Sequence, residues 1–178
     1  MDATEYHLYV LLRPLDILLV LKLSASPDAA QSYAGLAKAL GVSPSQAHSA
    51  ARRAREAWLL NESLEVRRRA ALDMLVPGIK YYLATREGAE SRGMPTSYGA
   101  SPIKELFGDH ERVPVWPMAE GGARGPSVEP IYETAPFAAK LDEGLYRLLV
   151  AVDAIRIGRA REVAAGREAL ERFYGATV

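Results

Sequence analysis

The chain has 178 residues, 49% of them hydrophobic, and a formal net charge of zero. This size and composition predict one globular domain, or one small domain with an extension. Because the chain has no cysteine, disulfides and thiolate metal sites are excluded, and we expect a cytoplasmic protein. The three histidines, at positions 7, 48 and 110, lie far apart, so we expect no zinc site and no cofactor.

Charge is unevenly distributed along the chain. Residues 31–69 carry seven basic and three acidic residues, a net charge of +4, whereas residues 1–30 and 70–178 each carry a net charge of −2. A basic module inside a slightly acidic chain favours nucleic-acid binding without requiring it. The leucine-rich stretch 10–23 is interrupted by Arg13, Pro14, Asp16 and Lys22, so we expect no membrane partner.

The N-terminal region holds the first predicted helix. The apolar stretch from Tyr6 to Leu12 fits either a strand or a first helical turn. Pro14 followed by Asp16 is typical of a helix start, and the leucine spacing predicts a helix over Leu15–Leu23. A polar loop follows, and Ser32 at its end is a candidate cap for the next helix.

Two helices joined by a tight turn are predicted over residues 33–60. Leu36, Ala37 and Leu40 recur at helical spacing, and Gly41 can adopt the left-handed backbone that ends a helix. Ser43, Pro44 and Gln46 then supply a cap, a first-turn proline and a capping-box partner for a second helix.

The second helix has two different sides. An inner side of small residues and one aromatic would let helices approach closely; it comprises Ala47, Ala50, Ala51, Ala54 and Trp58. The outer side carries amide, hydroxyl, imidazole and guanidinium groups, on Ser45, Gln46, His48, Ser49, Arg52 and Arg53. These groups are the ones that read base edges and contact phosphates.

This segment resembles the helix-turn-helix of winged-helix bacterial regulators of the multiple-antibiotic-resistance regulator (MarR) kind. The matching residues are Leu36-Ala37, Leu40-Gly41-Val42-Ser43 and Ala57-Trp58-Leu59-Leu60. Trp58 departs from that pattern, which usually has glycine there. The resemblance implies a winged helix-turn-helix with a recognition helix at 43–57 that enters the major groove.

A small hairpin is expected directly after this segment. Leu59-Leu60 and Leu64-Glu65-Val66 flank a polar turn at residues 61–63, and in the resembling families this hairpin is the wing. Arg67, Arg68 and Arg69 follow, and they are candidate phosphate contacts; their alternative role is that of a solvated helix start.

The middle of the chain is predicted to be less regular. A helix over 67–76 is broken or bent at Pro77-Gly78, and Ile79 to Ala84 fits either a strand or a continued helix. Residues 85–102 read as a long loop, followed by a short helix at 103–107. Two apolar stretches around the glycines at 121–125 predict a proline-rich hairpin in an edge position.

The final third is predicted to be helical. Leucines at helical spacing indicate a helix over 137–157, and Gly158 separates it from a second helix over 159–174. These helices either pack on their own domain or join two chains, as a regulator that reads a two-fold operator would need.

The predicted fold class is therefore mainly α: a winged helix-turn-helix with small β-hairpin elements and a C-terminal helical extension. We divide the chain into a DNA-binding domain (1–84), a loop-rich segment with a short hairpin (85–136) and a C-terminal helical region for dimerisation (137–178). The expected function is sequence-specific binding of double-stranded DNA by a homodimeric transcriptional regulator. Its candidate DNA-binding residues are Ser43, Ser45, Gln46, His48, Ser49, Arg52, Arg53, Arg67, Arg68 and Arg69.

Three alternatives stay open at this point. Residues 33–60 could be a plain helical hairpin in an all-helical core, or a helix-turn-helix reused for protein contacts. The chain could also be an antitoxin-like or adaptor protein whose C-terminal region binds a protein partner. An enzyme is not expected, because no catalytic constellation emerges. An effector site near Tyr81, Tyr82, Tyr98 and Trp116 is conceivable, since aromatic side chains often line such pockets.

Overall fold

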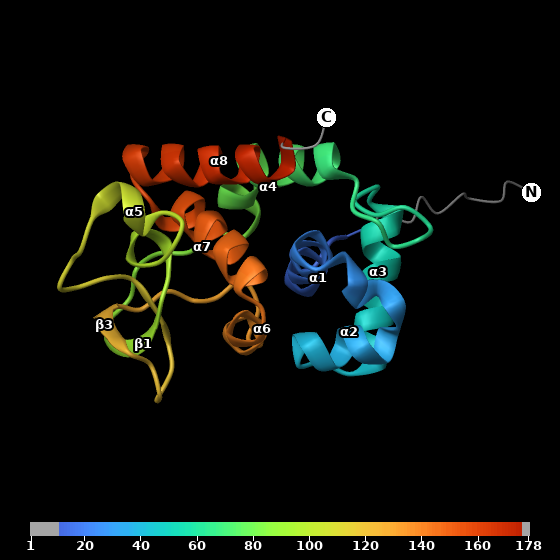
Figure 1. The fold of residues 1–178 in the computed structure, drawn as a ribbon, viewed down its shortest axis with the longest axis horizontal. Helices are drawn as coiled ribbons and strands as arrows, with labels where there is room; N and C mark the ends of the chain where they lie inside the picture. Colours follow the sequence, from blue (N-terminus) through green and yellow to red (C-terminus); the bar gives the residue numbers. More distant parts are fainter. Residues whose placement is uncertain (1–10, 176–178) are drawn as a thin grey trace, which may run out of the picture.

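A computed structural model describes residues 11–175 and shows a mainly helical fold with one small sheet (Figure 1). The prediction of a mainly α fold is confirmed. The interpretation of residues 6–12 as a strand or a helical turn falls mostly outside the described residues.

The first three helices lie together at one end of the molecule (Figure 1). They are α1 (Pro14–Ala25), α2 (Tyr33–Leu40) and α3 (Pro44–Glu56), and a 3-10 helix, η1 (Pro27–Gln31), connects α1 to α2. Every residue of α1 from Leu15 to Leu23 is buried, including Asp16 and Lys22. Helix α1 is therefore a core helix rather than an amphipathic one, as its near-continuous run of apolar residues allows.

Helix α4 (Arg68–Tyr82) continues without interruption through Pro77. Of the predicted break or bend at Pro77-Gly78, the break is therefore wrong, and residues 79–82 continue the helix rather than forming a strand. Ala71, Leu75 and Ile79 are buried and follow helical spacing, whereas Pro77 is exposed. Burial of that apolar row offsets the hydrogen bond that a proline removes from a helix interior.

The three strands form a small antiparallel sheet, β2-β1-β3. Its members are β1 (Glu90–Pro95), β2 (Val115–Pro117) and β3 (Ala123–Pro126). The expected loop at 85–102 thus contains the central strand. The first apolar stretch of the expected hairpin holds β2, whereas β3 lies in the glycine-rich segment that was expected to be the turn, and both strands pair with β1. The predicted edge position is confirmed for the first stretch, because β2 is an outer strand, whereas the second stretch forms only a single bridge between Ser127 and Val115.

Short helical segments lie around this sheet. A 3-10 helix, η2 (Ser97–Gly99), and α5 (Lys104–Phe107) connect β1 to β2. The short helix predicted at 103–107 is therefore confirmed apart from its first residue.

The single helix expected at 137–157 is two helices, α6 (Ala135–Leu141) and α7 (Glu143–Ile157). Asp142 separates them, and its carboxylate accepts the backbone N–H of Leu145 at 3.0 Å as the N-cap of α7. Helix α8 (Ala160–Gly175) follows Gly158 as expected and lies beside α4.

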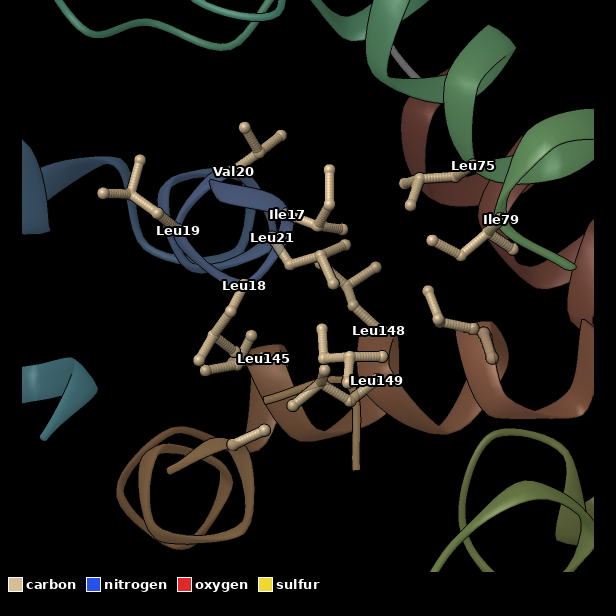
Figure 2. Packing of buried hydrophobic residues seen from close by; sticks show 14 of the residues in the cluster. Ile17, Leu18, Leu19, Val20, Leu21, Leu75, Ile79, Leu145, Leu148 and Leu149 are labelled. Carbon is tan, nitrogen blue, oxygen red and sulfur yellow. The ribbon is translucent and has the colours of Figure 1, made fainter. Parts of the chain in front are cut away.

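Helix α7 is the centre of the fold. Its residues 148–156 are all buried, and it contacts α1, α4, α6 and α8. Figure 2 shows Leu145, Leu148 and Leu149 of α7 meeting leucines of α1 and the side chains of Leu75 and Ile79 from α4. Buried residues from Leu15 to Tyr174 form one hydrophobic cluster, so α7 packs inside its own chain.

Candidate nucleic-acid interface

The α2–turn–α3 unit has the local structure that its sequence predicts. Ser32 accepts the backbone N–H of Gly35 at 3.0 Å, and Gly41 ends α2 with a φ of 68°. At the start of α3, Gln46 accepts from the N–H of Ser43 at 2.9 Å, and the Ser43 hydroxyl accepts from the N–H of Gln46 at 3.2 Å. The predicted caps and the capping box are confirmed, and together they fix where α3 begins.

One side of α3 is fully buried. Ala47, Ala50, Ala51 and Ala54 have 0% exposure, and α3 packs through them against α1 and α2. Small side chains let the three helices approach closely, so the helix is anchored along its whole length.

The opposite side of α3 faces solvent and carries most of the residues that were predicted to contact DNA. Ser49 is half-buried there, and the exposed residues are Ser43, Ser45, Gln46, His48 and Arg52. Since the Gln46 oxygen accepts the capping bond, its amide N–H₂ is the group left for a ligand. The His48 ring lies edge-on to Tyr33, 4.9 Å between centroids, so it packs against the start of α2.

A shallow groove borders the first half of this face. Ser45, Gln46 and Ser49 of α3 line it on one side, with Arg13, Pro14 and Tyr132 opposite, and its volume is about 370 Å³. Tyr132 belongs to the segment before α6, so a part of the chain distant in sequence lies beside the candidate reading face. A duplex that approaches α3 must therefore accommodate Tyr132 as well.

Arg53 has a different role from the predicted one. Its guanidinium donates to both carboxylate oxygens of Asp16, at 2.8 and 2.6 Å, and Asp16 is completely buried. Hydrogen bonding to Asp16 raises the pKa of Arg53, against the opposing effect of burial. This guanidinium is fixed to α1, so we remove Arg53 from the candidate phosphate contacts.

Trp58 does not lie on the inner side of the helix as expected. It follows the end of α3 with a φ of 62°, and its side chain is 65% exposed. The Arg67 guanidinium lies over its ring, 4.8 Å from the centroid. A positive φ at a bulky residue is strained, and glycine would relieve that strain.

The expected wing is reduced to a short loop. Leu60 and Val66 form one antiparallel bridge, and the N–H of Asn61 donates to the carbonyl of Glu65 at 2.9 Å. The Asn61 side chain accepts from the N–H groups of Ser63 and Glu65, which fills the interior of the turn. The N–H of Arg67 also donates to the carbonyl of Leu59 at 2.9 Å, so the expected small hairpin is present around the turn at 61–63, although no regular strand is formed within residues 59–67.

The three consecutive arginines point to three different partners. Arg67 is exposed over Trp58, and Arg69 is exposed beside Asp73, 3.0 Å from its carboxylate. Arg68 instead donates to the backbone carbonyls of Phe173 and Tyr174, which ties α4 to the end of α8. Arg68 is therefore a structural residue, whereas Arg67 and Arg69 remain available to phosphates.

One basic residue at this surface was missed by sequence reasoning. Arg55 lies near the end of α3, 3.3 Å from Glu62 in the reduced wing. Its position on the outer half of the helix follows from helical spacing, so the signal was present in the sequence.

The conceivable effector site built from aromatic residues is not formed as a unit. Tyr81 is 84% exposed, whereas Trp116 is buried and packs edge-on against Tyr146. Tyr82 donates to the carbonyl of Leu12. Tyr98 lines a separate cavity at the other end of the molecule, described below.

Comparison with known proteins gives no family assignment. No family model, no curated protein and no solved structure matches this chain. Among residues 11–175, no helix is both long and apolar enough to cross a bilayer, and no three acidic or histidine side chains cluster as a metal site would require.

Proposed function

We propose that this protein binds double-stranded DNA through α3 as a sequence-specific transcriptional regulator. The observation that supports the proposal most strongly is the division of α3 into two sides. The alanine side of α3 is entirely buried. The polar side begins at the capping box and is exposed at most positions, and none of its residues before Arg52 forms an ion pair within the described part of the chain. A rigidly anchored helix with a polar face open to solvent is the element that a helix-turn-helix inserts into the major groove.

The remaining basic residues suit phosphate contacts. Arg52 lies 3.5 Å from Glu56, and both side chains are largely exposed. Exposed ion pairs of this kind contribute about 0–1 kcal/mol, so a DNA phosphate can replace the carboxylate. Arg52, Arg55, Arg67 and Arg69 therefore form the proposed phosphate-binding set, and Ser43, Ser45, Gln46, His48 and Ser49 form the proposed base-reading set.

Replacement of Arg52 by alanine tests the proposal. Arg52→Ala should weaken binding to all DNA sequences similarly and reduce the slope of log K against log salt by about 1, because one phosphate contact is lost. Fluorescence anisotropy with a labelled duplex, at several salt concentrations, measures both quantities.

Arg172→Ala is the matched control. Arg172 is also exposed and also pairs with a glutamate four residues away on a helix, but it lies on α8. It should leave both the affinity and the salt slope unchanged. Equal effects of the two substitutions would show that α3 is not the DNA-binding element.

The alternative of a protein partner is favoured by one observation. Phe137 and Leu141, one helical turn apart on α6, are 47% and 64% exposed. Phe137 also lies over the turn at Gly41, so a partner bound there would cover the helix-turn-helix. The double variant Phe137→Ser with Leu141→Ser should still bind DNA if the main proposal holds. Sedimentation of the same variant and of the parent measures whether the chain forms the expected homodimer.

A further inference from the structure

A second candidate site lies at the opposite end of the molecule from α3. It is a cavity of about 720 Å³ lined by residues from the end of α4, the 3-10 helix η2, α5 and the junction of α7 with α8. Figure 1 shows α5 at the far end of the molecule from α3. Small-molecule sites typically have volumes of about 300–1,000 Å³, so the cavity is large enough for a ligand of nucleotide size.

Cationic side chains dominate the rim of this cavity. Lys80, Arg86, Arg159 and Arg161 line it, and none of them has a described carboxylate within 4.0 Å. Arg156 also reaches the cavity, but Asp153 neutralises it at 2.6 Å.

The net charge of the rim indicates the charge of a ligand that would fit it. The four cationic side chains without a described partner, together with Glu87 and Glu162, give the rim a net charge of +2. The 16-residue helix α8 begins here at Ala160, so its N-terminal N–H groups add to the positive potential. A phosphate monoester, which carries about −1.5 to −2 at neutral pH, would balance this charge.

Two buried polar atoms in the wall have no partner. Within residues 11–175, the buried side-chain oxygens without a hydrogen bond are Oγ of Ser97 and Oε2 of Glu162, and both residues line this cavity. Ser97 is 0% exposed. An unpaired buried polar group costs about 1–3 kcal/mol, which a ligand that hydrogen-bonds to it would recover. The Glu162 oxygen can only accept, so it calls for an N–H or O–H donor on the ligand.

Aromatic rings supply the third feature. Tyr98 lies 5.5 Å from the His110 ring and 6.4 Å from the Phe107 ring, and Arg161 lies 5.4 Å from the centroid of Phe107. A group of rings beside cationic side chains suits a planar heterocycle that stacks while its charged part meets the arginines.

We propose that this cavity binds a nucleoside monophosphate. Its phosphate would contact Arg86, Arg159 and Arg161, its base would lie against Tyr98 and His110, and its N–H or O–H groups would pair with Glu162 and Ser97. No residue of α3 lines the cavity, so nucleotide binding here would be independent of DNA binding.

Calorimetric titration of the full chain with AMP tests the inference, with inorganic phosphate and adenosine as separate ligands. AMP should bind more tightly than either of these, because inorganic phosphate lacks the base and adenosine lacks the phosphate. Arg161→Ala should weaken AMP binding about tenfold or more, since it removes a charge-assisted contact. Arg167→Ala is the matched control, because Arg167 is an exposed arginine on the same helix that does not line the cavity.

Ser97→Gly provides a second variant that should fold. Ser97 has a φ of 51°, which glycine adopts without strain, so the substitution removes the hydroxyl without endangering the backbone. It should lower the affinity for AMP while leaving the melting temperature equal or higher. No binding of AMP at millimolar concentration, equal binding of AMP and phosphate, or equal effects of Arg161→Ala and Arg167→Ala would each overturn the assignment.

Discussion

The ion pair between the buried Asp16 and the half-buried Arg53 is the residue-scale feature that differs most from the sequence prediction. Asp16 has no exposed surface, and its charge is compensated by two bonds from Arg53 and one from the N–H of Arg13. The pair also joins the start of α1 to the last turn of α3, so it holds the candidate recognition helix in place.

Arg53→Met should lower the free energy of unfolding by about 3–5 kcal/mol, because it leaves a buried carboxylate without its counter-charge. Adding Asp16→Leu should recover most of that loss, since two apolar side chains can replace a buried ion pair. Urea unfolding of the parent and the two variants measures both effects.

The DNA affinity of the same double variant distinguishes a structural role of Arg53 from a role in DNA contact. If Arg53 holds α3 and touches no phosphate, Asp16→Leu with Arg53→Met binds DNA as the parent does. A stable double variant that has lost DNA binding would show that Arg53 contacts DNA phosphates, as the sequence predicted.

Asp142 supplies a pH-dependent contact at the base of α7. Burial opposes its charge, but hydrogen bonds from Lys22, Ser26 and the N–H of Leu145 prevail and lower the pKa of Asp142. A carboxyl whose pKa is lowered by folding stabilises the fold above its unfolded pKa, about 3.9. This contribution is lost as the pH falls through the folded value.

Asp142→Asn should therefore cost about 1–3 kcal/mol near pH 7, where the charge-assisted bonds are intact. The difference from the parent should shrink as the pH falls through the lowered pKa of Asp142, because the parent carboxylate itself becomes protonated there. Urea unfolding over a series of decreasing pH values measures this change. A cost that does not change with pH would mean that the Lys22–Asp142 ion pair contributes nothing beyond the cap.

At the scale of elements, the α2–α3 turn depends on the conformation of Gly41. Its φ of 68° disfavours any residue with a Cβ, and an added Cβ would lie 2.9 Å from the Phe137 ring. Gly41→Ala should therefore lower stability by about 1–2 kcal/mol, measured by chemical denaturation.

Gly78 is the matched control for this substitution. It lies inside α4, and no atom other than those of its chain neighbours and the nearby helix backbone lies within 4 Å of the position of an added Cβ. Gly78→Ala should stabilise the protein by about 0.5–1 kcal/mol, because alanine is the better helix former. Destabilisation by both substitutions, to a similar degree, would contradict the conformational explanation.

Local signals explain which elements could be predicted. Ser32, Gly41, Ser43 and Gln46 define their structure through neighbours within four residues, so the sequence was sufficient there. Strand β1 could not be found, because Glu90–Pro95 lacks apolar alternation and is ordered by pairing with residues 20 or more positions away.

The candidate interface shows the same limit. Exposure of Ser45, His48 and Arg52 follows from helical spacing, whereas the commitment of Arg53 to Asp16 depends on a contact across 37 residues. Arg68 is a similar case, because its partners lie at the far end of the chain. Basic residues at helical spacing predict a charged face, but tertiary contacts decide which of them remain free.

For the whole molecule, α7 links the helical end to the sheet. Asp153 of this helix accepts from Thr96 and Trp116 at 2.7 Å, and Arg156 donates to the carbonyls of Leu83 and Glu129. These bonds join the sheet region and the end of α4 to the central helix. The proposed DNA-binding helix and the proposed nucleotide cavity thus lie at opposite ends of one continuous core.

Selection of bound fragments from a random pool of double-stranded DNA, at two salt concentrations, tests the central claim most directly. We predict that the parent chain enriches a defined sequence, palindromic if two copies bind. Gln46→Glu retains the oxygen that caps α3 but lacks the amide N–H₂, so it should lose preference at one base position, at a cost of about 1–3 kcal/mol. A parent chain that enriches no sequence, or a Gln46→Glu variant that enriches the same one, would contradict the account.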